Sequence, residues 1–441
     1  MLIVKNARVI DPASGYDRKS HICIADEQIV TILPADAALS AGSMPEEDPV
    51  IIDADGLIAA PGFIDVHVHF RDPGQTEKED IMTGAAAAKA GGYTTVICMA
   101  NTMPPIDSPE LLAANLAKGG QTGIHVLQAA TITKGMAGEE LADLKALKEA
   151  GAACFTDDGK PLMRPALVRE AMEKAAALGM VLSFHEEDPR MITQQGINEG
   201  VAAMMLELGS APARSEAIMI ARDVPMAKET GARIDIQHVS SGMSVNILRN
   251  AKANGVDVWA EATPHHFSLT EEAVMKWGPN ARMNPPLRSE IDRQAIIQGL
   301  KDGTIDMIAT DHAPHTKEEK SRPFQDAPSG IIGLETALAL GITNLVKPEH
   351  LTMAEFLAKM TCRPAACFRL DEGYEEDPAK AAGHLIKGGP ADIVLFDPDE
   401  QWTVADTFAS KAVNSPFIGA SLTGKVKYTI CGGKIVYQDE Q

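Results

Sequence analysis

The sequence lacks the signals of export and of membrane insertion. No apolar run approaches the roughly 18 residues that a membrane-spanning helix needs. The N-terminus, MLIVKNARVID, has no basic segment followed by a long apolar stretch, so we expect no signal peptide. The six cysteines form no CxxC pair and mostly stand in apolar segments, which predicts buried free thiols rather than disulfides. Together these absences favour a cytoplasmic protein with no membrane partner.

Positive charge is also scarce. Lys and Arg number 40 against 61 Asp and Glu, which gives a formal net charge of −21. Such a surface repels phosphates, so we expect no nucleic-acid partner. The acidity is expected mainly to keep the protein in solution. It leaves the charge of a small substrate open, because a local cationic site can sit in an acidic protein.

The middle of the chain alternates between two kinds of segment. From about residue 62 to 370, short apolar runs such as TTVICMA are followed by Ala-, Leu- and Glu-rich runs such as SPELLAANLAKG. This alternation predicts βαβ units and a parallel sheet. Both ends of the chain read instead as short β-branched strands. The simplest assembly is an α/β protein: a (β/α)8 TIM-type barrel at residues 60–372, and a small β-sandwich domain built from residues 1–59 and 373–441.

Two segments read as loops. Residues 315–330, HTKEEKSRPFQDAPSG, are charged, contain Pro and Gly and follow a predicted strand, so they form a candidate active-site loop. Residues 41–49, AGSMPEEDP, are expected to be an exposed loop of the small domain, and we assign them no function.

The segment GFIDVHVHFRDPG carries the first chemical signal. His67 and His69 are two residues apart in a predicted strand, so their imidazoles point to the same face. Two converging imidazoles are a natural pair of metal ligands. Other predicted strands close in the same way, with a potential ligand after an apolar run: Asp157, Asp158, His185, His238 and Asp311.

These strand ends are expected to meet, because the carboxyl ends of barrel strands form one rim. Taken singly, each residue could be a helix cap, a turn residue or a core histidine. Together they predict a site for zinc or a neighbouring divalent metal, since the set combines imidazole and carboxylate without cysteine. A metal with an open position lowers the pKa of bound water, an Asp can bridge two cations, and a second Asp can move a proton. The predicted chemistry is metal-dependent hydrolysis.

Five motifs extend this pattern: PGFIDVHVHFRDPG, GGYTTVICMANTMPP, FTDDG, MNPPLR and IATDHAPHT. They closely resemble those of dihydroorotases, in the amidohydrolase superfamily, and more narrowly the class with a bridging aspartate found in Gram-positive bacteria. The resemblance covers nearly the whole chain. It implies the zinc-dependent, reversible cyclisation of N-carbamoyl-L-aspartate to L-dihydroorotate in de novo pyrimidine biosynthesis.

The resemblance also implies roles for individual residues. Two zinc ions per subunit would be bridged by Asp158. His67, His69 and Asp311 would hold one ion. His185 and His238 would hold the second. Asp311 would also be the general base and then the general acid. The implied substrate-binding residues are His69, Arg71, Asn101, Asn284, His315, Ser329 and Gly330.

Among the implied contacts, the one between Arg71 and the substrate carboxylate has the most direct chemical support. Arg71 follows His69 by two residues, and its planar guanidinium suits a carboxylate. Asn101, the second implied carboxylate ligand, could equally be a turn former before Thr-Met-Pro-Pro. The chain departs from the usual motifs at Ala100, where proline is commoner, at Asp72 in RDPG, where REPG is frequent, and at Ser329, where relatives often carry a larger apolar residue.

Two alternative functions share part of this pattern. Allantoinases and dihydropyrimidinase-type enzymes usually bridge their metals with a carboxylated lysine, but the matching position here is Asp158. A non-catalytic dihydroorotase-like scaffold subunit of aspartate transcarbamoylase would have lost metal ligands, and this chain keeps each one. A homo-oligomer is expected. Association of an active enzyme with aspartate transcarbamoylase stays open.

Overall fold

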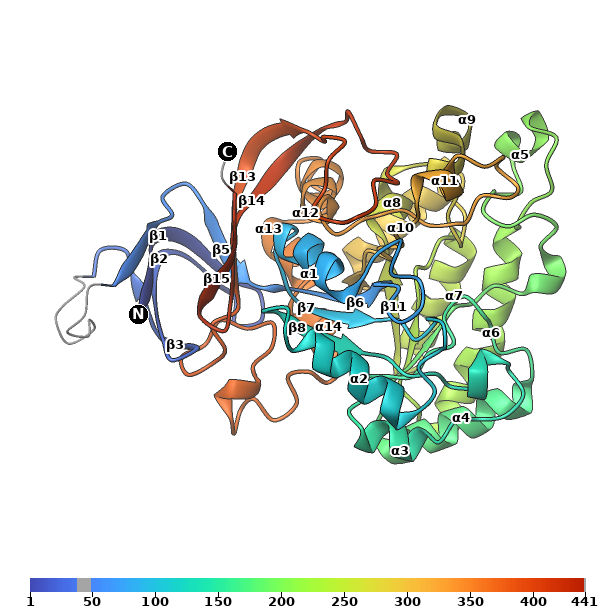
Figure 1. Ribbon diagram of the computed structural model, residues 1–441, viewed down its shortest axis with the longest axis horizontal. Helices are drawn as coiled ribbons and strands as arrows, with labels where there is room; N and C mark the ends of the chain where they lie inside the picture. Colours follow the sequence, from blue (N-terminus) through green and yellow to red (C-terminus); the bar gives the residue numbers. More distant parts are fainter. Residues whose placement is uncertain (38–48, 440–441) are drawn as a thin grey trace.

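The computed structural model describes residues 1–37 and 49–439. The segment 41–49 that was predicted as an exposed loop lies outside this range, except for its last residue. Figure 1 shows two regions: a barrel wrapped in helices, and a sheet beside it where both chain ends lie. Within the described ranges, no helix has the length and apolar character needed to cross a membrane.

The sheet is built from both ends of the chain. Among the described residues it has eight strands: β15 (Lys434–Gln438), β14 (Ser421–Cys431), β13 (Ile393–Thr403), β5 (Ile58–Pro61), β1 (Leu2–Asp11), β2 (Tyr16–Ala25) and β3 (Gln28–Pro34) in that order, with β4 (Val50–Asp53) beside β1. The antiparallel pair of β13 and β5 joins the two ends. A buried apolar cluster that includes Ile24, Ile393 and Ile430 fills its interior. The predicted small β domain is confirmed, while the exact boundaries at residues 59 and 372 stay a prediction.

The barrel is closed by eight parallel segments in the part of the chain that the structure describes. Seven are β6 (Phe63–Val68), β7 (Tyr93–Cys98), β8 (His125–Gln128), β9 (Leu182–Phe184), β10 (Ile234–Ile236), β11 (Val258–Ala262) and β12 (Met307–Ile308). The fourth in chain order is the run around Phe155, which bridges Ala130 on one side and Leu182 on the other. A bridge between Val68 and His312 closes the ring. The predicted (β/α)8 barrel is confirmed.

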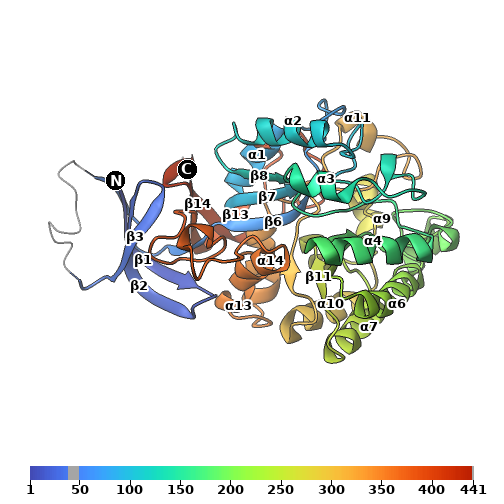
Figure 2. The ribbon, with the colours of Figure 1, turned by 90° about the horizontal axis from the view of Figure 1, so that it is seen from below.

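Helices cover the outside of the barrel, as Figure 2 shows from below. The α-helices of the described residues are α1 (Ile81–Ala90), α2 (Pro109–Gly119), α3 (Leu144–Glu149), α4 (Pro165–Leu178), α5 (Val201–Met205), α6 (Ala213–Thr230), α7 (Gly242–Ala253), α8 (Pro264–Ser268), α9 (Ala273–Trp277), α10 (Glu290–Asp302), α11 (Lys317–Lys320), α12 (Ala337–Gly341), α13 (Met353–Ala358) and α14 (Cys362–Cys367), of which α11 belongs to the 315–330 loop. Local signals set their ends. Asp80 and Thr83 form a capping box at α1, and Gly179 ends α4 in the left-handed conformation.

Candidate active site at the barrel rim

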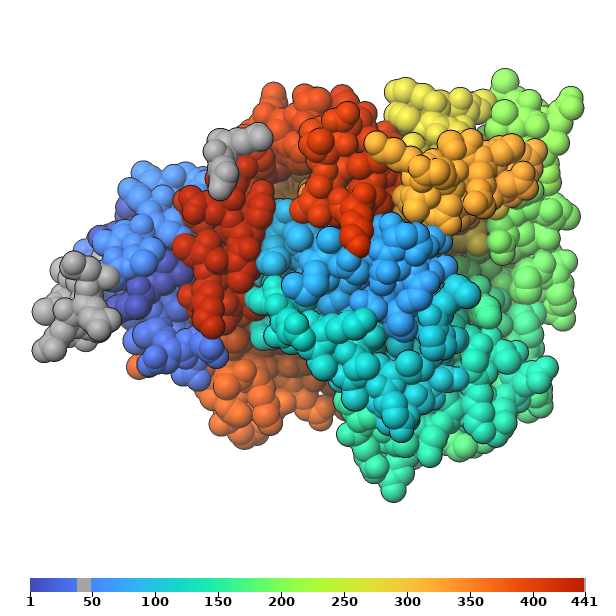
Figure 3. Space-filling model, in the orientation of Figure 1, coloured from blue at the N-terminus to red at the C-terminus, as the bar shows by residue number. Residues whose placement is uncertain are grey.

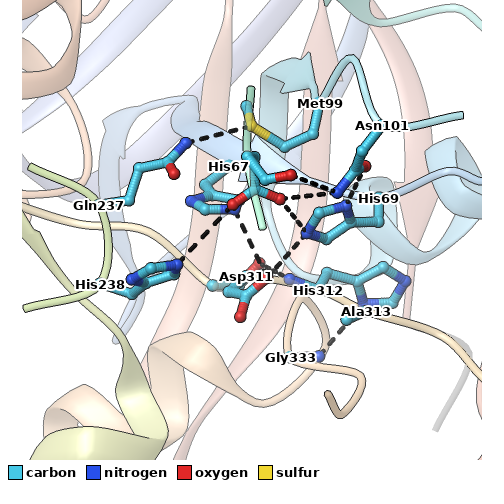
Figure 4. Close-up of polar contacts among 12 residues, drawn as sticks. His67, His69, Met99, Asn101, Gln237, His238, Asp311, His312, Ala313 and Gly333 are labelled. Carbon is cyan, nitrogen blue, oxygen red and sulfur yellow. Dashed lines mark hydrogen bonds and ion pairs between the residues drawn. The ribbon is translucent and has the colours of Figure 1, made fainter. Parts of the chain in front are cut away.

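The six predicted metal ligands lie at the carboxyl ends of the barrel strands. Each is within a strand or follows one closely: His67 (β6), His69 (after β6), Asp158 (after the Phe155 run), His185 (after β9), His238 (after β10) and Asp311 (after β12). Figure 4 shows His67, His69, His238 and Asp311 pointing toward a common centre. The structure therefore brings together residues that are up to 244 positions apart in the chain, since Asp311 follows His67 by 311 − 67 positions.

One group forms around His67 and His69. The Oδ1 of Asp158 lies 3.6 Å from His67 Nε2, and its Oδ2 lies 3.5 Å from His69 Nε2. The Oδ1 of Asp311 lies 3.6 Å from His67 Nε2 and 2.9 Å from His69 Nε2. Ligands of a tetrahedral zinc, each about 2.0–2.1 Å from the ion, are separated by roughly 3.3 Å. The four side chains are thus spaced as ligands of one ion would be.

A second group forms on the other side of Asp158. Its Oδ1 lies 3.8 Å from both His185 Nδ1 and His238 Nε2. These two imidazole nitrogens are 3.0 Å apart. The Asp158 carboxylate therefore faces both histidine pairs at once, which is the position that a bridging ligand needs.

His67 supplies a separate test of whether a metal fits. Its Nε2 is buried and has no hydrogen-bond partner within the described part of the chain, although buried polar atoms normally have one. Its Nδ1 lies 3.1 Å from Glu261 Oε2. A carboxylate at one ring nitrogen orients the other nitrogen toward a metal, as is common around metal-binding histidines. The donor set and this free nitrogen fit a divalent cation.

Burial and neighbouring charges act against each other at this site. Burial raises the pKa of the Asp158 carboxyl, but the imidazoles of His67 and His238 bring that pKa well below its ordinary value. For His67, burial lowers the pKa, yet the carboxylates of Glu261 and Asp158 raise it well above its ordinary value. The Asp158 carboxylate is therefore held ionised, and the negative charges that favour a proton on His67 lie around its ring. The same attraction would hold a metal cation.

Three of the site residues have strained backbones. Arg71, His238 and Asp311 are non-glycine residues in the left-handed region, with φ of 58°, 34° and 49°. Such conformations cost on the order of 1–3 kcal/mol each and persist only where the surrounding structure holds them. Their clustering at one rim marks it as a place where orientation matters more than stability.

A pocket of about 200 Å³ opens above these ligands. Its lining includes all seven residues that the sequence predicted as substrate contacts: His69, Arg71, Asn101, Asn284, His315, Ser329 and Gly330. Asp158, His185, His238 and Asp311 line it too, whereas His67 is completely buried. The 315–330 loop thus reaches the pocket with both of its ends.

Several of these side chains already bind one another. Asn101 Nδ2 donates to Asp158 Oδ2 at 2.8 Å, and Asn101 Oδ1 lies 3.0 Å from His69 Nδ1. Asn101 therefore orients two of the candidate metal ligands. Arg71 Nε donates to Pro314 O at 3.3 Å, and His315 Nε2 lies 2.8 Å from Ser329 O. The backbone carbonyl of Ser329 is thus occupied by His315.

Two residues that bind site residues, Glu261 and Asn414, were not themselves predicted as part of the site. Glu261 is completely buried in β11. A glutamate inside the apolar strand VWAEA was a signal that could have identified it. Asn414 lies 3% exposed between β13 and β14 and contacts the 315–330 loop. No local pattern distinguishes it from an ordinary loop asparagine.

Comparison with known proteins gives consistent results. Residues 56–244 match the family described as dihydro-orotase-like. The chain is 54% identical over 437 residues to a dihydroorotase of Clostridioides difficile (strain 630), covering 99% of this chain and 100% of that one. It is 53% identical over 441 residues to a dihydroorotase of Clostridium acetobutylicum, covering 100% of both. Among solved structures, L-hydantoinase (dihydropyrimidinase) from Arthrobacter aurescens matches with a TM-score of 0.86 at 25% identity, covering 100% of this chain and 96% of that one.

Proposed function

Because this chain belongs to the dihydroorotase family of cyclic amidohydrolases, we propose that its rim site interconverts N-carbamoyl-L-aspartate and L-dihydroorotate in pyrimidine biosynthesis. The observation that carries this proposal is the 54% identity along essentially the full length. The convergence of the predicted ligands at one rim supports it, because one Asp158 carboxylate faces two pairs of histidines.

The residues would hold two zinc ions per subunit. We assign His67, His69 and Asp311 to one ion and His185 and His238 to the other, with Asp158 as the bridge. Bound there, the ions would supply Lewis-acid activation of water and of a carbonyl group. Asp311 is assigned as the group that moves the proton, because its carboxylate reaches both the metal ligands and the pocket.

The substrate would be held by the other residues that line the pocket beside the metal ligands. Arg71 donates through Nε to Pro314 O and lines the pocket, which supports its assignment to the substrate carboxylate. Asn284, His315 and the Ser329–Gly330 backbone would surround the ring. Asn101 donates through Nδ2 to Asp158. To bind the substrate carboxylate, Asn101 would have to exchange one of these hydrogen bonds for one to the substrate.

An assay with dihydroorotate, dihydrouracil and allantoin side by side tests the proposal. Dihydrouracil is dihydroorotate without the carboxylate, so it serves as the matched control for Arg71. We expect turnover of dihydroorotate and little of the other two. If the protein turns over dihydrouracil or allantoin but not dihydroorotate, the proposal is wrong. The activity would then be of the hydantoinase type, as named for a similar solved structure.

Metal content and assembly need separate measurements. Elemental analysis of protein never exposed to chelator is expected to find about two zinc ions per chain, since one tetrahedral ion cannot use all six ligands. Absence of any transition metal would contradict the ligand assignment. We also propose a homo-oligomer in the cytoplasm. Light scattering with and without added aspartate transcarbamoylase would show whether that enzyme joins it.

A further inference from the structure

The chain between β13 and β14 leaves the terminal sheet and packs on the barrel. Residues 404–420 lie against the segments after β6 and after β12, as the space-filling view shows by the contact of red-orange atoms with blue and orange ones. Ser410 Oγ donates to the buried carboxylate of Glu79, and Lys411 pairs with Asp80 at the start of α1. Residues 404–420, which connect two strands of the terminal sheet, therefore contact the rim that carries the site.

Asn414 is a residue of this segment that binds three residues of the pocket lining. Its Oδ1 accepts a hydrogen bond from the backbone N–H of His315 at 3.1 Å. Its Nδ2 donates to Ala313 O and to Gly330 O, each at 3.1 Å. Its own backbone carbonyl accepts from Ile332 N at 3.1 Å. One buried side chain thus joins the two segments that carry His315 and Gly330 into the pocket.

The chemistry of an amide explains why asparagine suits this position. The two segments pair at His312 and Ile331, where Ala313 N donates to Ile331 O at 2.8 Å. Beyond that point Ala313 O and Gly330 O need donors, because buried backbone carbonyls left without one are costly. The amide has two N–H donors and one carbonyl acceptor, so it serves both carbonyls and the His315 N–H together.

The approach of the segments is also unusually close. Gly330 has a φ of 118°, and a Cβ at that position would lie 2.5 Å from the Cβ of Ala313. Glycine is therefore needed for the two segments to meet. The position of Gly330 then depends on the hydrogen bonds that hold this contact, and those from Asn414 are among them.

We propose that Asn414 is a positioning residue for substrate binding, which holds His315 and the Gly330 backbone in the arrangement that receives the ring. The inference rests on the proposed function, because it concerns the same pocket. Its hydrogen bonds go to the substrate side of the site and to none of the six metal ligands. Loss of the amide should therefore weaken substrate binding and leave metal binding intact.

The substitution Asn414→Asp tests this inference. It keeps the shape of the side chain, removes both N–H donors and sets a carboxylate against two carbonyl oxygens. We expect the KM for dihydroorotate to rise at least about tenfold, the factor that corresponds to 1.4 kcal/mol. Zinc content should stay at the wild-type value, and kcat should fall less than KM rises. Asn344→Asp is the matched control, since that amide donates to Ser268 Oγ and Leu340 O, away from the pocket.

The outcomes separate the two proposals. A wild-type protein that does not act on dihydroorotate refutes the proposed function. An active wild type with a KM in Asn414→Asp no higher than in Asn344→Asp refutes the role of Asn414. Loss of zinc together with substrate affinity also refutes it, because the residue would then support the whole rim. If Asn414→Asp fails to fold, Asn414→Ser removes the amide without adding charge, and an unchanged KM in that variant is equally decisive.

Discussion

The terminal sheet and the barrel rim bury their side chains to opposite effect. The sheet encloses aliphatic side chains such as Ile24, Ile393 and Ile430, and burial of apolar surface stabilises a fold by about 25 cal/mol per Å². The rim buries imidazoles and carboxylates, among them His67 and Asp158, whose desolvation costs free energy unless they are paired. The apolar burial that stabilises the terminal sheet is therefore separate from the polar burial that serves the chemistry of the rim. Each variant below tests that separation.

The largest effect is expected at the rim from Asp311→Asn. The amide keeps the size of the side chain but cannot take up the proton. Turnover of dihydroorotate should fall at least ~100-fold, the scale of lost general acid–base catalysis. Asp302→Asn, in the exposed Arg249 ion pair, is the control. Near-normal turnover of Asp311→Asn would remove this residue from its role.

In the sheet, Ile430→Ala should lower the stability of the protein and leave its catalytic activity unchanged. Ile430 is completely buried and pairs with Ile393 on the neighbouring strand. Removing its side chain should lower the free energy of unfolding by about 2–5 kcal/mol. The kcat/KM of the molecules that remain folded should not change. Ile435→Ala, on β15 at 38% exposure, should cost far less. Chemical denaturation and an assay at low temperature measure both quantities, and a fall in kcat/KM would show that the regions are coupled.

Glu261→Gln should affect the metal more than the fold. The carboxylate that orients His67 is lost, which should weaken zinc binding about 10- to 100-fold. Because the side chain keeps its volume, the free energy of unfolding should change less than in Ile430→Ala. Competition with a chelator measures the zinc affinity, with Glu290→Gln on the surface of α10 as control. Equal affinities would show that Glu261 is only a buried acid.

Arg71→Lys should act on the substrate alone. Lysine keeps the charge but loses the planar fork. We expect the KM for dihydroorotate to rise about tenfold, close to the loss of one charge-assisted hydrogen bond. Zinc content should be unchanged, and Arg249→Lys should behave as wild type. An unchanged KM in Arg71→Lys would place the carboxylate elsewhere in the pocket.

The smallest effect is expected where the two regions meet, at the pair of His125 Nε2 and Asp392 Oδ2, which are 2.9 Å apart. The hydrogen bond to Asp392 raises the pKa of His125 to about 11. The pair therefore stabilises the fold below about pH 6.5, the ordinary pKa of histidine, and this contribution is lost as the pH rises through about 11. The His125 side chain is 53% exposed, so solvent limits the contribution to about 1 kcal/mol or less. Wild type and His125→Gln should differ in urea stability near pH 6 and converge in alkali. A difference independent of pH would exclude the ion pair as its cause.

The architecture and the convergence of the candidate ligands could be predicted because their signals are local. His67, His185, His238 and Asp311 each close or follow an apolar run, and the shared rim of a parallel barrel brings such ends together. The run before Asp158 shows the limit of this reading. It pairs with both neighbours but is too short to form a regular strand.

Glu261 and Asn414 could not be predicted in the same way. Their roles come from partners far along the chain, since 194 residues separate Glu261 from His67 and 99 separate Asn414 from His315. Such partners become neighbours only when the barrel closes and the segment after β13 settles on it. A sequence pattern within a window of about ten to twenty residues cannot predict contacts that form only when the barrel closes or when the segment after β13 packs on it.

The pairing of β13 with β5 has a consequence for synthesis of the chain. The N-terminal strands emerge from the ribosome first, yet the edge of β5 that receives β13 has to wait for Ile393–Thr403. Asn414 follows later still, so the substrate pocket gains one of its supports only when almost the whole chain has been made. A nascent chain that ends after the barrel would carry all six proposed metal ligands but would lack Asn414 at the pocket. Under the proposed function, the residues of the metal site are therefore all synthesised before the last support of the substrate pocket.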